Sequence, residues 1–294
     1  MPQEILRQKR PEWLKVRLPE GSNYLEIKRL LRSSGLHTVC EEANCPNIGE
    51  CFNQRTATFL ILGNVCTRRC RFCNIEKGET YPVDPEEPER VALAAKSMGL
   101  RHIVVTSVTR DDLQDGGALH YANSILAIRR FNPESTIEVL IPDFKGSEEA
   151  LSLVISAAPE VINHNIETIH RLYKIARPGA KYKRSLQLLE SVKRENPVVI
   201  TKSGLIVGLG EQFSEITDVM KDLAEIGCQI LTIGQYLSPG KGHLSVNKFY
   251  HPDEFNELKN IGYELGFKFV EAGPLVRSSY HAANQFNQRH NPSA

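Results

Sequence analysis

The sequence predicts an α/β fold: a partial (β/α)6 parallel barrel, with a cysteine-bearing N-terminal extension before it and a C-terminal tail after it. Apolar runs rich in β-branched residues alternate with segments of helical periodicity, which is typical of parallel βαβ units. The length of 294 residues suits a single α/β barrel, although length alone would also allow two domains.

The expected elements follow one another from residue 58. Strands are expected at 58–62, 102–108, 136–141, 160–163, 198–207, 229–233 and 267–270. Helices are expected at 86–98, 117–131, 147–157, 181–195, 213–226 and 252–265. Glycines that end helices, such as Gly99 and Gly227, support these boundaries. We therefore divide the chain into an extension at 1–56, a barrel at 57–272 and a polar tail at 273–294.

Composition excludes several classes of protein. Lys plus Arg number 36 and Asp plus Glu number 35, so the net charge of +1 gives no case for a nucleic-acid partner. No apolar run approaches the roughly 18 to 20 residues of a membrane helix. The polar start at residues 1–13 lacks the apolar centre of a signal peptide, so we expect a cytoplasmic protein.

Cysteine is concentrated in one part of the chain. Of seven cysteines, six lie between Cys40 and Cys73. Such clustering in a cytosolic chain favours metal binding over disulfides. The seventh, Cys228, stands at an expected helix-to-strand junction and is interpreted as a core residue.

Cys66, Cys70 and Cys73 form a C-x3-C-x2-C triad directly after the first strand, where parallel folds gather their sites. Three thiolates can hold three irons of a 4Fe–4S cluster and leave the fourth open. Nearby cations would favour the thiolate form. These cations are Arg68, Arg69 and Arg71. The alternatives are three buried structural cysteines or part of a zinc site, although zinc sites more often use C-x2-C pairs.

This triad, with Phe72 at its aromatic position, resembles the signature of radical S-adenosylmethionine enzymes. In that family the open iron binds the amino and carboxylate groups of S-adenosylmethionine. The resemblance places Phe72 and the GLIVGLGE segment near the adenine, and Gly116 and Gly117 near the methionine amino group. Within the GLIVGLGE segment, the expected contacts are Gly204, Gly208 and Glu211. Ala118 replaces the family's usual glutamate, and glycines are also ordinary in turns.

A second triad lies upstream of the barrel, with C-x4-C-x5-C spacing: Cys40, Cys45 and Cys51. Its position before the first triad resembles the lipoyl synthase family, and the resemblance covers nearly the whole chain. It extends to segments 106–118, 163–168, 177–179 and 204–211, and to the RSSY motif at 277–280. In that family a serine of the RSSY motif completes a second cluster. By position this serine is Ser279, with Ser278 as the second choice.

The resemblance implies a reaction, cofactors and partners. Two sulfur atoms would be inserted at carbons 6 and 8 of an octanoyl chain held on a lysine of a carrier domain. The first 4Fe–4S cluster would reduce S-adenosylmethionine to methionine and a 5′-deoxyadenosyl radical that removes a hydrogen atom. The second 4Fe–4S cluster would supply the sulfur, and two S-adenosylmethionine would be used. The implied partners are acyltransferase subunits of 2-oxoacid dehydrogenases, the glycine cleavage carrier protein and an electron donor protein.

Further polar residues are candidates for the site. Glu167 could accept a hydrogen bond from a ribose hydroxyl, and Arg177 could clamp a carboxylate. His164 is interpreted either as a site residue or as a hydrogen-bonded structural histidine. Asp111 or Asp112 could cap a helix.

Three other classes of protein share part of this pattern. A biotin synthase-like or methylthio-transferring radical enzyme would share Cys66–Cys73, but it gives no reason for the triad at 40–51. A zinc-stabilised binding module would not need a barrel large enough for a cofactor. An iron–sulfur electron-transfer protein would ligate both clusters fully and leave no open iron.

Overall fold

The sheet is an open parallel barrel. The computed structural model describes residues 10–16 and 19–288. One sheet of eight strands has the order β1-β2-β5-β6-β7-β8-β9-β10. Seven of its strands pair in parallel, namely β2 (Thr58–Ile61), β5 (His102–Ser107), β6 (Thr136–Leu140), β7 (Val161–Asn163), β8 (Ile200–Val207), β9 (Ile230–Gln235) and β10 (Phe269–Gly273). Because β1 and β10 stand at opposite ends of this order, the predicted partial barrel is confirmed.

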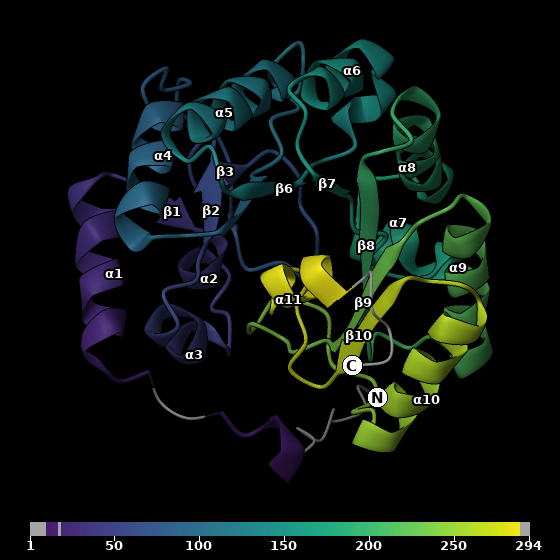
Figure 1. Ribbon diagram of the computed structural model, residues 1–294. Coiled ribbons are helices and arrows are strands. Elements are labelled where there is room, and N and C mark those ends of the chain that lie inside the picture. The colour runs from purple at the N-terminus through teal and green to yellow at the C-terminus, as the bar shows by residue number, and fades with distance from the viewer. Residues whose placement is uncertain (1–9, 17–18, 289–294) are drawn as a thin grey trace.

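Six helices connect the parallel strands and lie outside them (Figure 1). They are α4 (Glu87–Met98), α5 (Ala118–Phe131), α6 (Glu148–Ser156), α8 (Tyr182–Glu195), α9 (Phe213–Glu225) and α10 (Pro252–Glu264). All six expected helices and all seven expected strands are present, with ends shifted by a few residues. The sequence shows why α9 forms: a capping box of Gln212 and Glu215 begins it, and apolar residues three and four apart face the core.

The N-terminal extension is part of the same sheet. It contains α1 (Ser22–Ser33), α2 (Val39–Glu42) and α3 (Ile48–Asn53), and its strand β1 (His37–Thr38) pairs antiparallel with β2. This pairing was not predicted, since two residues are too few to show a strand period. Residues 1–9 and 17–18 of the expected extension lie outside the described residues.

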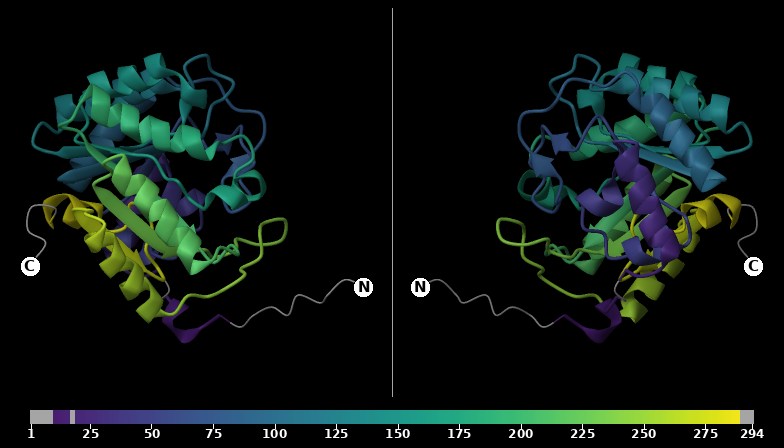
Figure 2. Two further views of the ribbon diagram at one scale, coloured as in Figure 1. Left: turned by 90° about the vertical axis from the view of Figure 1, so that its right-hand side faces the viewer. Right: turned by 90° about the vertical axis from the view of Figure 1, so that its left-hand side faces the viewer.

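The segment after β10 is folded back, whereas the sequence predicted a polar tail. Its helix α11 (Ala282–Gln288) contacts β5 and β10. Phe286 packs against Val161, Ile200, Ile230 and Phe269, the first residues of four of the strands. In the side views of Figure 2, α11 lies at one end of the barrel and β3 and β4 at the other. Helix α11 therefore closes the amino end of the barrel, and residues 289–294 lie outside the described part.

A buried ion pair crosses the barrel interior. Lys202 Nζ on β8 lies 2.7 Å from Glu138 Oε1 on β6, and His102 Nε2 lies 3.3 Å from Glu138 Oε2. Burial alone would raise the pKa of Glu138, but the charge of Lys202 and the hydrogen bond with His102 lower it to about 2. The carboxylate is therefore ionised inside the barrel.

No helix in residues 10–16 and 19–288 is long and apolar enough to cross a membrane.

Candidate functional site

The first cysteine triad opens into a cavity at the carboxyl ends of β2, β5, β6 and β7. Cys66, Cys70 and Cys73 all line this cavity, as do Phe72, Glu167 and Arg177. Apolar side chains cover much of the remaining wall: Val39, Leu60, Val108, Leu140 and Ile141. The structure thus brings the predicted cluster ligands together with three of the predicted cofactor contacts.

Backbone contacts hold the cysteine loop. Strand β3 (Val65–Cys66) pairs with β4 (Glu76–Lys77), and Thr67 N donates to Thr109 O at 3.0 Å. Arg71 N donates to Ala176 O at 2.9 Å. The Cys66 sulfur accepts hydrogen bonds from two backbone N–H groups, those of Arg68 and Thr109. The loop is thereby fixed to two other connections, the one after β5 and the one after β7.

Burial favours the protonated thiols of Cys70 and Cys73 in the absence of a metal. It raises the pKa of Cys73 to about 12. Burial also raises the pKa of Cys70, and the opposing effects of Arg177 and Arg68 do not overcome it. Arg68 thus favours the Cys70 thiolate, as expected, but burial has the larger effect on the pKa in the metal-free site. Cluster assembly must release these protons.

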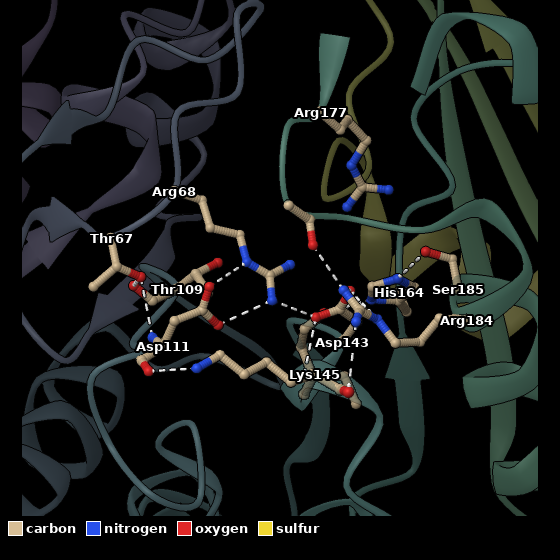
Figure 3. Close-up of polar contacts among 12 residues, drawn as sticks. Thr67, Arg68, Thr109, Asp111, Asp143, Lys145, His164, Arg177, Arg184 and Ser185 are labelled. Carbon is tan, nitrogen blue, oxygen red and sulfur yellow. Dashed lines mark hydrogen bonds and ion pairs between the residues drawn. The ribbon is translucent and has the colours of Figure 1, made fainter. Parts of the chain in front are cut away.

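Arg68 forms salt bridges with two aspartates, Asp111 and Asp143 (Figure 3). Its guanidinium contacts both carboxylate oxygens of Asp111 at 2.8 and 2.9 Å, and one oxygen of Asp143 at 2.6 Å. Asp143 is fully buried and also accepts from Arg184 Nε at 2.8 Å. Lys145 Nζ donates to the Asp111 carbonyl at 2.7 Å. This network joins the cysteine loop to the loops after β5 and β6 and to α8.

The prediction that Asp111 or Asp112 caps a helix is wrong. Asp111 binds Arg68, and Asp112 binds Arg110 and Thr80. Asp115 caps α5 instead, because its carboxylate accepts from Gly117 N and Leu119 N at 2.9 and 2.8 Å.

One part of the cavity lining presents polar atoms that lack hydrogen-bond partners among the described residues. Asn165 Nδ2 donates to Glu167 Oε1 at 3.1 Å, and Arg177 Nη1 donates to Asn165 O at 2.9 Å. However, Asn165 Oδ1, Arg177 Nε and Ser107 Oγ are buried and make no hydrogen bond to any residue that the structure describes, and all three residues line the cavity. Buried polar atoms are normally paired, so this wall fits a polar ligand.

His164 is a hydrogen-bonded histidine that also lines the cavity. Its Nδ1 lies 2.8 Å from Ile141 O and its Nε2 lies 2.9 Å from Ser185 Oγ (Figure 3). Burial, and then the nearby Arg177, lower its pKa to about 4. The imidazole is therefore neutral, and both of its nitrogens are engaged.

The other predicted cofactor contacts lie outside the lining of this cavity. Gly116 and Gly117 have φ values of 62° and 91° in the turn before α5, where Leu62 and Phe144 pack against them. A Cβ on Gly204 would lie 2.7 Å from Asn165 Oδ1, so Gly204 supports the polar wall from behind. Glu211 accepts from the backbone N–H groups of Gly208 and Leu209. Roles for these residues at the cofactor stay predictions.

The second triad lies at a separate cavity. Cys40 and Cys51 line it together with Ser279, Thr58, His102 and Val104. Cys45 is close enough that its charge raises the pKa values of Cys40 and Cys51, after burial as the larger cause, to about 12 and about 11. Ser278 faces the first site instead, where it accepts from Asn165 Nδ2 at 3.4 Å. The structure thus separates the two serines that the sequence left as alternatives.

The two cavities share strands. Thr58 lines the second cavity and Leu60 the first, and Val104 and Thr106 divide in the same way. Residues two apart on a strand point to the same face, so both sites lie along the inner face of the barrel. Cys228 is buried in the core away from both, with its sulfur 3.5 Å from Ile230 O, as predicted.

The thiols of both triads are available as metal ligands. All seven cysteines are free of disulfides. Within residues 10–16 and 19–288, no three or more His, Cys, Asp or Glu side chains converge on one metal position. A mononuclear zinc ion needs ligands within about 2.0–2.3 Å of a single point, whereas thiolates on an iron–sulfur cluster bind different irons and stand apart.

Comparison with known proteins agrees with this site. A model described as the radical SAM superfamily matches residues 60–223. The structure of SuiB from Streptococcus suis bound to its precursor peptide SuiA is similar, with a TM-score of 0.57 at 12% identity over 79% of this chain and 54% of that chain. The fold and the site thus define a radical S-adenosylmethionine enzyme, a class that uses a 4Fe–4S cluster and S-adenosylmethionine.

The more particular family follows from closer relatives. A model of the N-terminal domain of lipoyl synthase matches residues 2–45. Lipoyl synthase from Caldanaerobacter subterraneus is 57% identical over 93% of this chain and 96% of the relative. Lipoyl synthase from Rubrobacter xylanophilus is 58% identical over 96% of this chain and 88% of the relative. The chain belongs to the lipoyl synthase family, whose members are sulfur-inserting radical enzymes.

Proposed function

We propose that this protein inserts two sulfur atoms, at carbons 6 and 8, into an octanoyl chain carried on a lysine of a lipoyl carrier domain. Cys66, Cys70 and Cys73 would hold the cluster that works with S-adenosylmethionine. A second cluster, the sulfur donor, would be held by Cys40, Cys45, Cys51 and Ser279. The observation that carries the proposal is that two separate cysteine triads lie at two cavities that share strands of one barrel.

The chain's residues divide the work of the first site. When bound, the first cluster and S-adenosylmethionine supply the abstraction of hydrogen from an unactivated C–H bond, and the second cluster supplies sulfur. The unpartnered atoms of Ser107, Asn165 and Arg177 are suited to bind the polar groups of S-adenosylmethionine, and Phe72 offers an apolar face to the adenine. The apolar wall excludes water and accepts an alkyl chain.

Ser279 suits a ligand that must leave. A serine oxygen is a harder donor than a thiolate and holds iron less firmly. Ser279 lines the cavity of the second triad, and the consecutive residue Ser278 contacts Asn165 of the first site. This two-residue stretch therefore spans the two sites, and loss of the serine ligand would open one iron of the second cluster.

The substrate and setting complete the proposal. The extension and the segment after 272 would serve the second cluster, and the 57–272 barrel would serve the radical chemistry. The acyl carriers would be domains of 2-oxoacid dehydrogenase acyltransferase subunits and the glycine cleavage carrier protein. A separate protein would donate electrons, and the reaction would take place in the cytoplasm.

Anaerobic turnover with an octanoylated carrier peptide tests the function directly. The product, read by mass, should gain two sulfur atoms, and 5′-deoxyadenosine and methionine should accumulate with it. Iron analysis and ultraviolet–visible spectra of the same sample distinguish an iron–sulfur enzyme from a zinc-stabilised binding module, which would contain no iron. S-adenosylmethionine that stays intact in the presence of reductant would instead support an electron-transfer protein.

A further inference from the structure

A tyrosine–carboxylate contact joins the C-terminal segment to the helix that carries Cys51. Tyr280 Oη donates to both carboxylate oxygens of Glu50, each at 3.1 Å. His281 stacks on Tyr280 with ring centroids 3.8 Å apart, and its Nε2 lies 3.4 Å from Glu50 Oε1. Glu50 directly precedes Cys51, and Tyr280 directly follows Ser279. The contact therefore joins the neighbours of two proposed ligands of one cluster.

Other contacts hold the same segment on either side of Ser279. Asn47 Nδ2 donates to Leu275 O at 2.7 Å, and Gln285 Nε2 donates to Tyr280 O at 2.6 Å. The segment also passes so close to β9 that a Cβ on Gly234 would lie 2.0 Å from Val276 O. Only glycine permits this approach. The backbone around Ser279 is thus anchored before any cluster is considered.

The side chain of Ser279 is not held by a hydrogen bond of its own in the described part of the chain. An untethered loop would lose conformational freedom when it bound iron, and that loss would weaken the ligand. A contact on the adjacent residue removes this cost by ordering the loop in advance.

We infer that Glu50 and Tyr280 form a latch that positions Ser279 over the second cysteine triad and governs how readily this serine leaves the cluster. The inference rests on the proposed ligation by Ser279. Glu50 and Tyr280 are positioning residues, since neither needs to touch the cluster or the substrate.

The test uses the full chain with Cys66, Cys70 and Cys73 changed to Ala, so that all bound iron belongs to the second cluster. Iron release to a chelator is measured for Tyr280→Phe, Glu50→Gln, Ser279→Ala and the double variant Ser279→Ala/Tyr280→Phe. Tyr182→Phe is the matched control, because Tyr182 Oη makes a similar bond of 2.6 Å to Asp222 between α8 and α9.

Tyr280→Phe should accelerate iron release roughly threefold to tenfold, as expected for one hydrogen bond lost. Glu50→Gln keeps an acceptor for the tyrosine hydroxyl and should give a smaller effect. The double variant should release iron no faster than Ser279→Ala, since the latch acts through the serine. Hydrogen exchange of residues 275–288 in the cluster-free chain should rise in Tyr280→Phe and stay unchanged in Tyr182→Phe.

The outcomes separate the latch from the serine assignment. If Ser279→Ala accelerates release while Tyr280→Phe does not, the latch is wrong and the serine ligand stands. Additive effects in the double variant would also overturn the latch, because Tyr280 would then act independently of Ser279. If Ser279→Ala leaves release unchanged, the serine ligation itself is wrong. If Tyr280→Phe does not fold, iron release is compared between Glu50→Gln and Tyr182→Phe. Faster release in Glu50→Gln supports the latch, and equal release overturns it.

Discussion

The location of Cys66, Cys70 and Cys73 distinguishes them from the other cysteines, since these three line the first cavity. Replacing all three with Ala should remove about half of the roughly eight irons expected for two 4Fe–4S clusters, along with all cleavage of S-adenosylmethionine. The physical reason is that no other thiol lines this cavity in the described chain. Iron analysis and 5′-deoxyadenosine formation are the measurements.

Cys228→Ala is the control for that variant. Its sulfur is buried in the core, so the variant should keep its full iron content and its radical chemistry. A triple variant that still produced 5′-deoxyadenosine would contradict the assignment of the radical site.

The two serines of the RSSY motif allow a second test at single residues. Ser279→Ala should retain a cluster on three cysteines and lose most of the complete insertion, whereas Ser279→Cys should bind the cluster and release sulfur poorly, since thiolate holds iron more firmly. Product mass and iron content are measured together. Full activity in Ser279→Ala with loss in Ser278→Ala would move the ligand to Ser278, and full activity in both would remove serine from the site.

At the residue scale, the sequence predicted those site residues that belong to short motifs. The cysteine triads were predicted from their spacing, and Phe72, Glu167 and Arg177 from their place in short motifs along the chain. The partners of Arg68 and of Tyr280 were not predicted, because they come from loops far away in the chain. The one available signal for Asp143 was its position just after the third parallel strand, where sites gather.

At the scale of elements, regular periodicity predicted the helices and strands of the barrel. The polar residues inside the barrel follow no periodic pattern, so their contacts could not be predicted from the sequence. Lys202 and Glu138 are charged residues within otherwise apolar strands, and only the pairing of β6, β7 and β8 shows that they face each other.

This pair predicts a pH-dependent stability. Glu138→Gln should lower the free energy of unfolding by about 3–5 kcal/mol at neutral pH, because it leaves Lys202 buried without its counter-charge. The folded-state pKa of Glu138 is lowered from 4.5 to about 2, so its contribution is present above pH 4.5 and is lost as the pH falls toward 2. Urea unfolding at pH 7 and at pH 3 measures the difference.

Glu254→Gln is the comparison, since Glu254 forms a partly exposed pair with Lys248 and should cost no more than about 1 kcal/mol. An equal effect of the two variants at pH 7 would refute a special role for the interior pair.

At the scale of the whole molecule, the fold brings together segments that are distant in sequence. Residues 40–51, 66–73 and 277–280 meet at one barrel, and α11 closes its amino end. The return of the C-terminal segment could not be predicted, because α11 is short and Phe286, which packs against the ends of four strands, is its one large apolar residue.

This arrangement predicts separate duties for the two triads. Replacing Cys40, Cys45 and Cys51 with Ala should abolish sulfur insertion and leave some abortive formation of 5′-deoxyadenosine, since the first cavity keeps its own thiols. Product analysis by mass and chromatography checks both parts. A normal yield of lipoyl groups without added sulfide would contradict the division.

The most direct test follows the sulfur. The protein is reconstituted with sulfide of a heavy sulfur isotope, freed of unbound sulfide, and given octanoylated carrier peptide, S-adenosylmethionine and reductant. Both inserted sulfur atoms should carry the heavy isotope, and no more than one lipoyl group should form per chain, because the second cluster is consumed. Unlabelled sulfur in the product, or many lipoyl groups per chain without added sulfide, would show that the cluster held by Cys40, Cys45 and Cys51 is not the sulfur source.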